Sequence, residues 1–232
     1  MKIKIITIVF PDMKLKTYHI PKLRGFFSNK FPQNTEFHNH LPDGKFSYKF
    51  PQIQYRIINE HPVLIGINDG IDILKKVFFD LDEIIISNRK YILNEKEIIL
   101  TEKEFGIADE FIDYHFISPW MALNEDNYAK YNQINKFEQQ KLLKRILIGN
   151  IISMSKGFIY TIPDDFVIEV EGYFKPKKVN FKNRKMLCFT GDFMTNFNIP
   201  DHLGLGKQSA RGFGVVVEGD NCNCRFRIDD NF

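Results

Sequence analysis

Two histidines separated by a single residue are the side chains of this chain best suited to chemistry. His38 and His40 lie in the sequence Phe37-His-Asn-His-Leu41. Residues two apart on an extended strand project from one face roughly 7 Å from each other, so two imidazoles can flank one phosphodiester. An imidazole pKa of about 6.5 lets one ring accept a proton and the other donate one near neutral pH. The pair predicts general acid–base catalysis, and the spacing leaves open which histidine is the base.

The residues around the pair predict a β-hairpin, because Pro42-Asp-Gly44 separates two alternating stretches and Asp-Gly is a preferred hairpin loop. The expected register turns Tyr48 toward the apolar side and gathers the polar groups His38, His40, Lys45, Ser47 and Lys49 on the other side. This arrangement suits RNA cleavage, in which a base removes the 2′-hydroxyl proton, an acid protonates the departing 5′-oxygen, and a cation stabilises the phosphorane. No carboxylate cluster with metal-site spacing stands nearby in the sequence, so we expect neither a metal nor another cofactor. The alternative is that both histidines are solvated loop residues without a chemical role.

A glycine-rich segment near the C-terminal end, residues 204–214, predicts a phosphate-binding loop. It reads Gly-Leu-Gly-Lys-Gln-Ser-Ala-Arg-Gly-Phe-Gly and matches neither the P-loop nor the dinucleotide fingerprint. Paired glycines let a backbone approach a phosphate closely, and two cations supply charge. The candidate ligands of this Gly-rich loop are Gly204, Gly206, Lys207, Ser209, Arg211, Gly212 and Gly214. The alternative is a bulged turn that leads into a core strand.

A second basic group lies in residues 173–185, where six cations alternate with Tyr173, Phe174 and Phe181. Such a mixture can bind phosphates and stack bases. We expect phosphate contacts from Lys177, Lys178, Lys182 and Arg184. A solvated β-hairpin with a lysine-rich tip is an equally good interpretation of these residues alone, and the net charge of +3 permits a nucleic acid without requiring one.

The first half of the chain has the element order of a ferredoxin-like domain, which RRM domains share. The pattern predicts strands at 2–10, 52–57, 63–67 and 83–86, a helix at 22–30, and a helix capped by Asn68-Asp-Gly70. The buried face expected for this second helix consists of Ile71, Leu74, Phe78 and Leu81.

The second half repeats a mixed pattern, with a strand at 111–117, a long helix at about 125–154, strands at 166–174 and 186–193, and a final strand after the Gly-rich loop. The expected buried stripe of the long helix is Leu142, Leu143, Ile146, Leu147 and Ile151. We therefore predict an α+β protein of two tandem ferredoxin-like (RRM-like) domains, 1–107 and 108–232, with a C-terminal Gly-rich loop.

Composition agrees with a folded, non-membrane protein. Hydrophobic residues make up 44% of the chain, enough for real cores. No apolar run approaches the roughly 20 residues of a membrane span, and the N-terminus alternates like a strand rather than a signal peptide. Three cysteines without a CxxC pair, Cys188, Cys222 and Cys224, indicate neither a disulfide framework nor a zinc site. We expect a cytoplasmic protein.

The glycine pattern, together with Ile20-Pro-Lys-Leu-Arg-Gly25 and Phe37-His-Asn-His-Leu-Pro-Asp-Gly-Lys45, resembles the RAMP superfamily of CRISPR-associated proteins. The paired histidines resemble its two-histidine branch of repeat-processing endoribonucleases. The resemblance implies metal-independent cleavage of CRISPR precursor RNA within its repeats, with His38 and His40 as the catalytic pair. It also implies a tyrosine, matched by Tyr48, with Lys30 and Lys45 as electrostatic support. The hairpin register conflicts with this role of Tyr48, so either the segment is an open loop or Tyr48 is structural. The first domain would carry the catalytic residues and the second the RNA-binding loop.

The implied partner is the CRISPR repeat RNA, with a CRISPR effector complex and a homodimer as further expectations. The rival hypothesis is a non-catalytic RNA-binding RAMP subunit of an effector complex, and a generic RRM-like RNA binder is the third. The paired histidines favour the enzyme over both, because neither alternative requires them.

Overall fold

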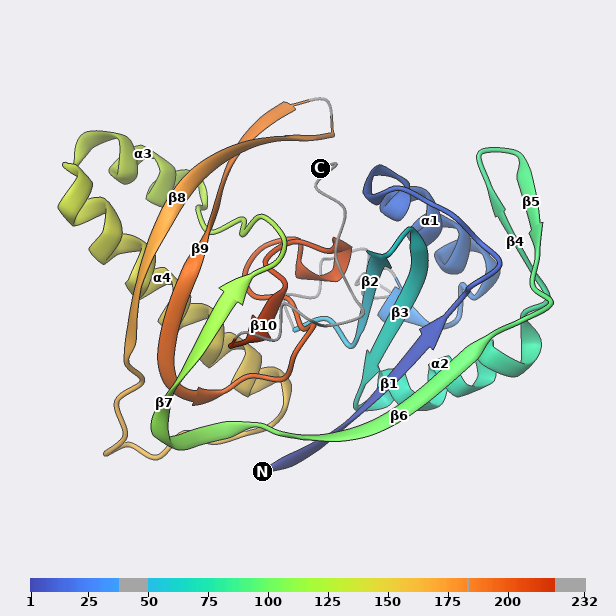
Figure 1. Cartoon of the computed structure of the whole chain (residues 1–232), viewed down its shortest axis with the longest axis horizontal. Helices are drawn as coiled ribbons and strands as arrows, with labels where there is room; N and C mark the ends of the chain where they lie inside the picture. Colours follow the sequence, from blue (N-terminus) through green and yellow to red (C-terminus); the bar gives the residue numbers. More distant parts are fainter. Residues whose placement is uncertain (38–49, 183, 220–232) are drawn as a thin grey trace. The chain divides into compact units, whose positions relative to one another are not determined.

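The structure is a computed structural model of the 232-residue chain, and it describes residues 1–37, 50–182 and 184–219 (Figure 1). The chain divides into two compact units. The N-terminal unit consists of Lys2–Lys103 together with Ala210–Gly212, and the C-terminal unit contains Met1, Glu104–Ser209 and the described residues from Phe213 onward. Each unit is built on a four-stranded sheet.

The sheet of the N-terminal unit has the strand order β2-β3-β1-β6. Its strands are β1 (Lys2–Val9), β2 (Ile53–Ile58), β3 (His61–Ile67) and β6 (Glu97–Glu104). Strand β3 pairs antiparallel with both β1 and β2, and the helices α1 (Ile20–Lys30) and α2 (Asp69–Asp80) are the two connections of a ferredoxin-like unit.

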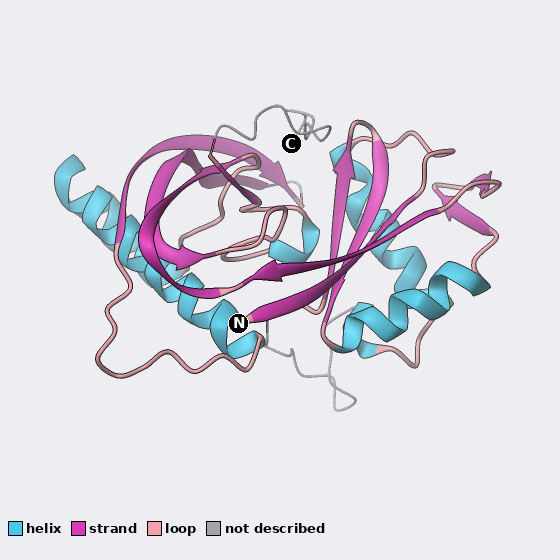
Figure 2. Ribbon diagram, turned by 60° about the horizontal axis from the view of Figure 1, so that its bottom comes forward, coloured by secondary structure: helices cyan, strands magenta, loops and turns pink. Residues whose placement is uncertain are grey.

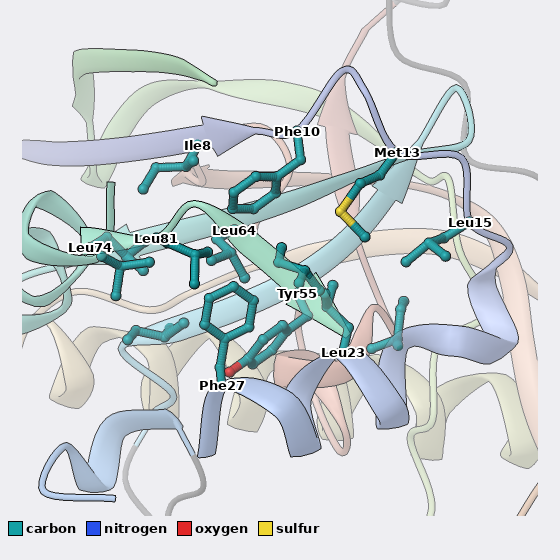
Figure 3. Packing of buried hydrophobic residues seen from close by; sticks show 14 of the residues in the cluster. Ile8, Phe10, Met13, Leu15, Leu23, Phe27, Tyr55, Leu64, Leu74 and Leu81 are labelled. Carbon is teal, nitrogen blue, oxygen red and sulfur yellow. The ribbon is translucent and has the colours of Figure 1, made fainter. Parts of the chain in front are cut away.

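The core of this unit forms because alternate residues of the strands and one side of each helix are apolar. Tyr55 and Leu64 are directly paired across β2 and β3, and both are fully buried. Phe27 of α1 and Leu74 of α2 pack into the same cluster (Figure 3). Both helices therefore cover one face of the sheet.

The buried face of α2 differs from the expected one. Leu74, Val77 and Leu81 are buried, whereas Ile71 and Phe78 are only partly buried against the core. The helix approaches the sheet closely at Gly70, where any side chain would collide with the Gln52 carbonyl oxygen. Because of this close approach, Leu74 and Val77 are the helix residues that face the sheet. Asn68 occupies the N-cap position as expected, but its side chain makes no capping hydrogen bond.

The expected fourth strand of the first sheet is wrong. Residues 83–86 do form a strand, β4 (Glu83–Ile86), but it pairs with β5 (Arg89–Ile92) in a separate two-stranded sheet. The turn between them uses Ser87 and Asn88 at φ of 51° and 66°, as a two-residue hairpin turn requires. The fourth place belongs to β6, whose residues are almost all exposed.

The C-terminal unit has the equivalent strand order, β10-β7-β9-β8. Its strands are β7 (Gly106–Phe116), β8 (Val170–Phe181), β9 (Arg184–Asn198) and β10 (Val216–Glu218). The predicted class, an α+β protein with two tandem ferredoxin-like domains, is confirmed. Figure 2 shows the long helix α4 (Lys136–Gly157) lying along this curved sheet.

The single helix expected at 125–154 is wrong, because the chain forms α3 (Glu125–Gln133) and α4 with a break between them. The Asn135 side chain caps α4 by accepting a hydrogen bond from the Glu138 N–H at 3.0 Å. The expected stripe of α4 is buried except for Ile146, which is half-buried. No helix among the described residues is both long and apolar enough to cross a membrane.

Strands β8 and β9 form a long hairpin that pairs without a register shift from Val170–Thr195 to Phe181–Arg184. Strand β8 is at the edge of the sheet, and α4 covers part of that edge. The Gln140 side-chain amide donates to the Phe174 carbonyl and accepts from the Phe174 N–H, each at 2.9 Å. One helix side chain thus takes the place of a neighbouring strand at this residue.

Candidate functional site

The Gly-rich loop is closed at its base by backbone pairing. Gly204 bridges to Val215, and the Leu205 N–H donates to the Gly214 carbonyl at 2.8 Å. The Gly214 N–H donates in turn to Pro119 at 2.9 Å, and Lys207 N–H donates to Met121 at 3.1 Å. These bonds fasten the loop on both sides of Trp120, the single tryptophan of the chain.

Close packing around Trp120 explains why two positions of the loop are glycine. Its ring is fully buried, stacks on Phe116 with centroids 5.2 Å apart, and donates its Nε1–H to Asn150 Oδ1 at 3.0 Å. Gly206 has φ of +79°, and a Cβ there would lie 2.7 Å from the indole Nε1. Gly214 has φ of +62°, and a Cβ there would collide with the Leu205 carbonyl oxygen. Packing alone accounts for these glycines, and the RNA-binding role of the loop stays a prediction.

The remaining loop candidates differ in exposure. Lys207 is exposed, Arg211 is half-buried, and Ser209 is buried, as are the backbones of Gly204 and Gly212. Burial lowers the pKa of Arg211, and repulsion from the Arg24 cation lowers the pKa further. Lys207 and Arg211 are therefore the loop side chains placed to attract a phosphate.

The basic stretch 173–185 forms the outer part of the β8–β9 hairpin and its turn. Lys178, Lys182 and Arg184 are exposed and Lys177 is half-buried. Lys178 and Val179 are adjacent in β8, so they face opposite sides, and Val179 is buried. The structure therefore agrees with a hairpin that has a lysine-rich tip, and its role in binding RNA stays a prediction.

Within the C-terminal unit, the end of the hairpin contacts Phe213 of the Gly-rich loop. Phe181 at the end of β8 contacts Phe213 of the Gly-rich loop edge to face, with ring centroids 5.5 Å apart. The Lys182 ammonium group lies 5.7 Å from the Phe181 ring centroid. Residues more than 30 positions apart in the sequence thus form one candidate surface.

The predicted hairpin with His38, His40, Lys45 and Tyr48 lies outside the described residues. Its N-terminal neighbour Phe37 is described and is held firmly. Phe37 is fully buried, and its ring packs against Phe27 and Phe31, each with centroids 5.6 Å apart. The Phe37 carbonyl accepts hydrogen bonds from Arg24 Nε at 3.0 Å and from Ser28 Oγ at 3.3 Å. The residue that immediately precedes His38 is therefore fixed to α1.

Arg24 is the site residue that the sequence analysis did not single out. It lies within Ile20-Pro-Lys-Leu-Arg-Gly25, a segment that carried the family resemblance, so a signal was present. Burial lowers the pKa of Arg24. The side chain is a half-buried cation that donates to the Phe37 carbonyl, so it places positive charge beside Phe37.

Lys30 is the last residue of α1 and is exposed. It lines a cleft of about 530 Å³ together with Lys22 of the same helix. This location agrees with a supporting electrostatic role, which stays a prediction.

The tandem ferredoxin-like units match the fold of solved Cas6 structures. Solved structures agree: the structure resembles Csf5, described as a CRISPR-Cas type IV Cas6 crRNA endonuclease, with a TM-score of 0.54 at 9% identity. That match covers 94% of this chain and 100% of the other, and it shows the fold alone.

Both halves of the chain match family models. The Cas6b N-terminal domain matches residues 1–104, and the Cas6b C-terminal domain matches residues 106–219. The chain belongs to the Cas6b family, which confirms the resemblance drawn from the sequence.

Individual relatives agree with this assignment. A crystal structure of Cas6b is 40% identical, with a TM-score of 0.87, and covers 94% of this chain and 100% of its own. A second, titled as the CRISPR RNA processing endoribonuclease Cas6b, is 35% identical with a TM-score of 0.76 and the same coverage. An uncharacterized protein of Methanocaldococcus jannaschii is 43% identical over 145 residues, which are 61% of this chain and 96% of that protein.

Proposed function

We propose that this protein is a metal-independent endoribonuclease that cuts CRISPR precursor RNA within its repeats. The observation that carries the proposal is the match of both halves to Cas6b, including a solved CRISPR RNA processing endoribonuclease at 35% identity. At this identity over nearly the whole chain, the same broad activity is the expected one.

In the proposed reaction the 2′-oxygen attacks the adjacent phosphorus and the bond to the 5′-oxygen breaks. One histidine of the His38–His40 pair takes the 2′-hydroxyl proton, and the other protonates the departing oxygen. The products are a 5′-hydroxyl end and a 2′,3′-cyclic phosphate, which can open to a 3′-phosphate. Two imidazoles supply both proton transfers, so the chemistry requires no metal ion.

The cations of the site would stabilise the extra negative charge of the phosphorane. Lys30 and Lys45 are the proposed support, and Tyr48 is the proposed third catalytic group. The anchoring of Phe37 to Arg24 and Ser28 supports this proposal, because a catalytic residue needs a fixed neighbour to hold its position.

The repeat RNA would bind to Lys207 and Arg211 of the Gly-rich loop and to the hairpin cations Lys177, Lys178, Lys182 and Arg184. The contact between Phe181 and Phe213 supports a joint surface, because it places the loop beside the hairpin. Association with a CRISPR effector complex and formation of a homodimer stay predictions from the sequence.

The test is cleavage of the protein's own repeat RNA in EDTA, with an RNA carrying a single 2′-deoxy substitution at the cut site as control. We expect cleavage to continue in EDTA and the deoxy RNA to remain intact, because it lacks the attacking oxygen. A requirement for Mg²⁺, or cleavage of the deoxy RNA, would contradict the mechanism. Tight binding without any cleavage would favour the non-catalytic RAMP subunit instead.

A further inference from the structure

The β4–β5 hairpin forms a groove with the segments beside it in the N-terminal unit. Two clefts, of about 530 Å³ and 410 Å³, adjoin each other and share Ile86 and Ser87 as lining residues. Both volumes lie in the range of roughly 300–1,000 Å³ that ligand sites occupy. The two clefts therefore lie next to each other along the β4–β5 hairpin.

The first cleft runs along α1. Lys22, Phe26 and Lys30 line it at helical spacing, one above the other, and Ile85 of β4 lines it from the hairpin. Lys22 Nζ donates to Ser87 Oγ at 2.7 Å, which holds this lysine at the junction of the two clefts. The far end of the cleft is Lys30, the proposed supporting residue of the catalytic site.

The second cleft combines cations with exposed aromatic rings. Lys14 and Arg89 line it, and the Arg89 guanidinium lies 4.8 Å from the Tyr91 ring centroid. Tyr18 is 64% exposed, and its ring centroid lies 4.2 Å from that of His19. Burial lowers the pKa of His19, so this ring is neutral at pH 7 and adds aromatic surface rather than charge.

The charge of the groove is strongly positive. Its lining includes one carboxylate, Glu60, which is paired with Lys16. Within the described part of the chain, none of the other cations of the groove forms an ion pair with a carboxylate; these are Lys14, Lys22, Lys30 and Arg89. Four cations without an acidic partner among the described residues, along one open groove, fit a polyanion.

We propose that this groove binds a single-stranded segment of the RNA substrate that leads away from the cut site. The cations would follow the backbone phosphates, and Tyr18 would stack on an unpaired base. Continuity supports this occupant, since the groove ends at Lys30 and the chain then leads to the anchored Phe37 beside His38. The inference rests on the proposed function for the position of the cut, and the groove itself contains no proposed catalytic pair.

The charge test compares two double variants of equal charge. Lys14→Ala with Arg89→Ala removes two groove cations, and Lys75→Ala with Lys76→Ala removes two exposed cations from α2. Binding is measured by fluorescence anisotropy over a salt titration, with 2′-deoxy RNA so that nothing is cut. The two probes are the repeat with its single-stranded flank and the same repeat without the flank.

We expect the groove variant to lose about tenfold in affinity for the flanked RNA and to have a salt slope smaller by roughly 1.4, or ~0.7 per contact for a single strand. Its affinity for the unflanked RNA should equal that of the wild type, and the α2 control should bind both RNAs normally. Equal losses on both RNAs, or no loss on either, would overturn the proposal.

The stacking test uses Tyr18→Leu and Tyr18→Phe with 2-aminopurine placed at successive positions of the flank. One position should be quenched in the wild type, remain quenched in Tyr18→Phe, and become bright in Tyr18→Leu. Unchanged quenching in Tyr18→Leu would mean that the groove binds any polyanion, an acidic peptide included, and the RNA proposal would fail.

Cleavage of the flanked RNA with a normal 2′-hydroxyl separates the two proposals. If the wild type fails to cut it while the groove effects persist, the proposed function fails and the groove stands. If cleavage is normal and the groove effects are missing, the groove proposal alone fails.

Discussion

The two units share one strand order and differ in the connection before the last strand. In the N-terminal unit this connection begins with the helix α2, whose Leu74 and Val77 are buried against the sheet. In the second sheet, the connection between β9 and β10, residues 199–215, contains only a short 3₁₀ turn, Ser209–Arg211. The Gly-rich loop occupies the place that a helix fills in the other unit.

This difference shows how one framework serves two purposes. A helix satisfies its own backbone hydrogen bonds and needs only an apolar face, whereas a loop must find a partner for each backbone group. The Gly-rich loop finds these partners in Pro119 and Met121, and its glycines allow it to pass close to Trp120. The loop can therefore present Lys207 and Arg211 from a fixed backbone.

The first prediction tests whether the catalytic residues lie in the N-terminal half of the chain, and it has the largest expected effect. His38→Ala and His40→Ala, both within the Cas6b N-terminal domain, should each slow single-turnover cleavage by roughly 10²–10⁴-fold. RNA affinity should change little, because a neutral imidazole attracts phosphate weakly. The double variant should be less impaired than the product of the single effects, since the two groups act as a unit.

The rate–pH profile of the wild type serves as the control for this prediction. It should be bell-shaped, and each single variant should lose one limb. Near wild-type rates in both variants would remove the histidines from the mechanism. A normal rate in one variant alone would replace the two-imidazole model by one histidine acting with Tyr48 or a lysine.

The second prediction concerns the loop as a packed structure. Gly214→Ala should lower the free energy of unfolding by more than about 2 kcal/mol, because φ of +62° and the Leu205 carbonyl both oppose a Cβ. Gly149→Ala in α4 is the control: nothing lies within 4 Å of its added Cβ, so it should stabilise by about 0.5–1 kcal/mol. Urea unfolding followed by Trp120 fluorescence measures both. Equal stability of the two variants would show that packing does not require Gly214.

The third prediction asks whether RNA binding belongs to the C-terminal unit. A triple variant, Lys178→Ala with Lys182→Ala and Arg184→Ala, should weaken RNA binding and reduce the salt slope by about 2–3, or ~0.7–0.9 per lost phosphate contact. Lys130→Ala with Lys136→Ala and Arg145→Ala, all exposed in α3 and α4, removes the same charge elsewhere in the unit. If both triple variants bind alike, the RNA lies away from the hairpin.

The fourth prediction has the smallest effect and uses the thiol of Cys188 as a probe. Residues 1–104 contain no cysteine, so labelling of Cys188 reports on the C-terminal unit. Cys188 is fully buried, and burial raises the pKa of its thiol to about 12. At pH 8 we expect iodoacetamide to modify this cysteine only when the C-terminal unit opens, as measured by mass spectrometry of its peptide. Increasing urea should accelerate labelling along with loss of Trp120 packing. Rapid labelling of the native protein would contradict the burial.

The sequence predicted those elements whose hydrophobic pattern matches their burial. Strand β3 was correct, and so was the buried row of α4 apart from Ile146, because these apolar residues lie in the core. Hairpin-like segments were expected up to about residue 105, but the place of β6 in the first sheet could not be recognised, because the position of an almost wholly exposed edge strand depends on backbone pairing that no side-chain pattern reports. The break at Asn135 was missed because the long helical stretch was treated as one element, and Asn135 is a strong N-cap residue.

The candidate site shows the same division. Basic residues that alternate with aromatic ones can be recognised in the sequence. Lys182 and Arg184 were identified in this way as candidate RNA contacts. Arg24 was passed over because its role depends on Phe37, thirteen residues later, whose carbonyl it reaches only in the folded chain. Contacts of this kind follow from tertiary packing.

The covered edge of β8 has a consequence for how this protein behaves at high concentration. The Phe174 backbone points away from β9 to meet Gln140, and in an antiparallel ladder the next outward position is two residues on. That residue is Pro176, which has no N–H to offer, and the following outward position is the charged Lys178. A second chain could not pair with Phe174, whose backbone groups are bonded to Gln140, or accept a hydrogen bond from Pro176. It would then meet the positive charge of Lys178. The long hairpin is therefore protected against edge-to-edge aggregation, and a homodimer formed by adding strands at this edge is disfavoured.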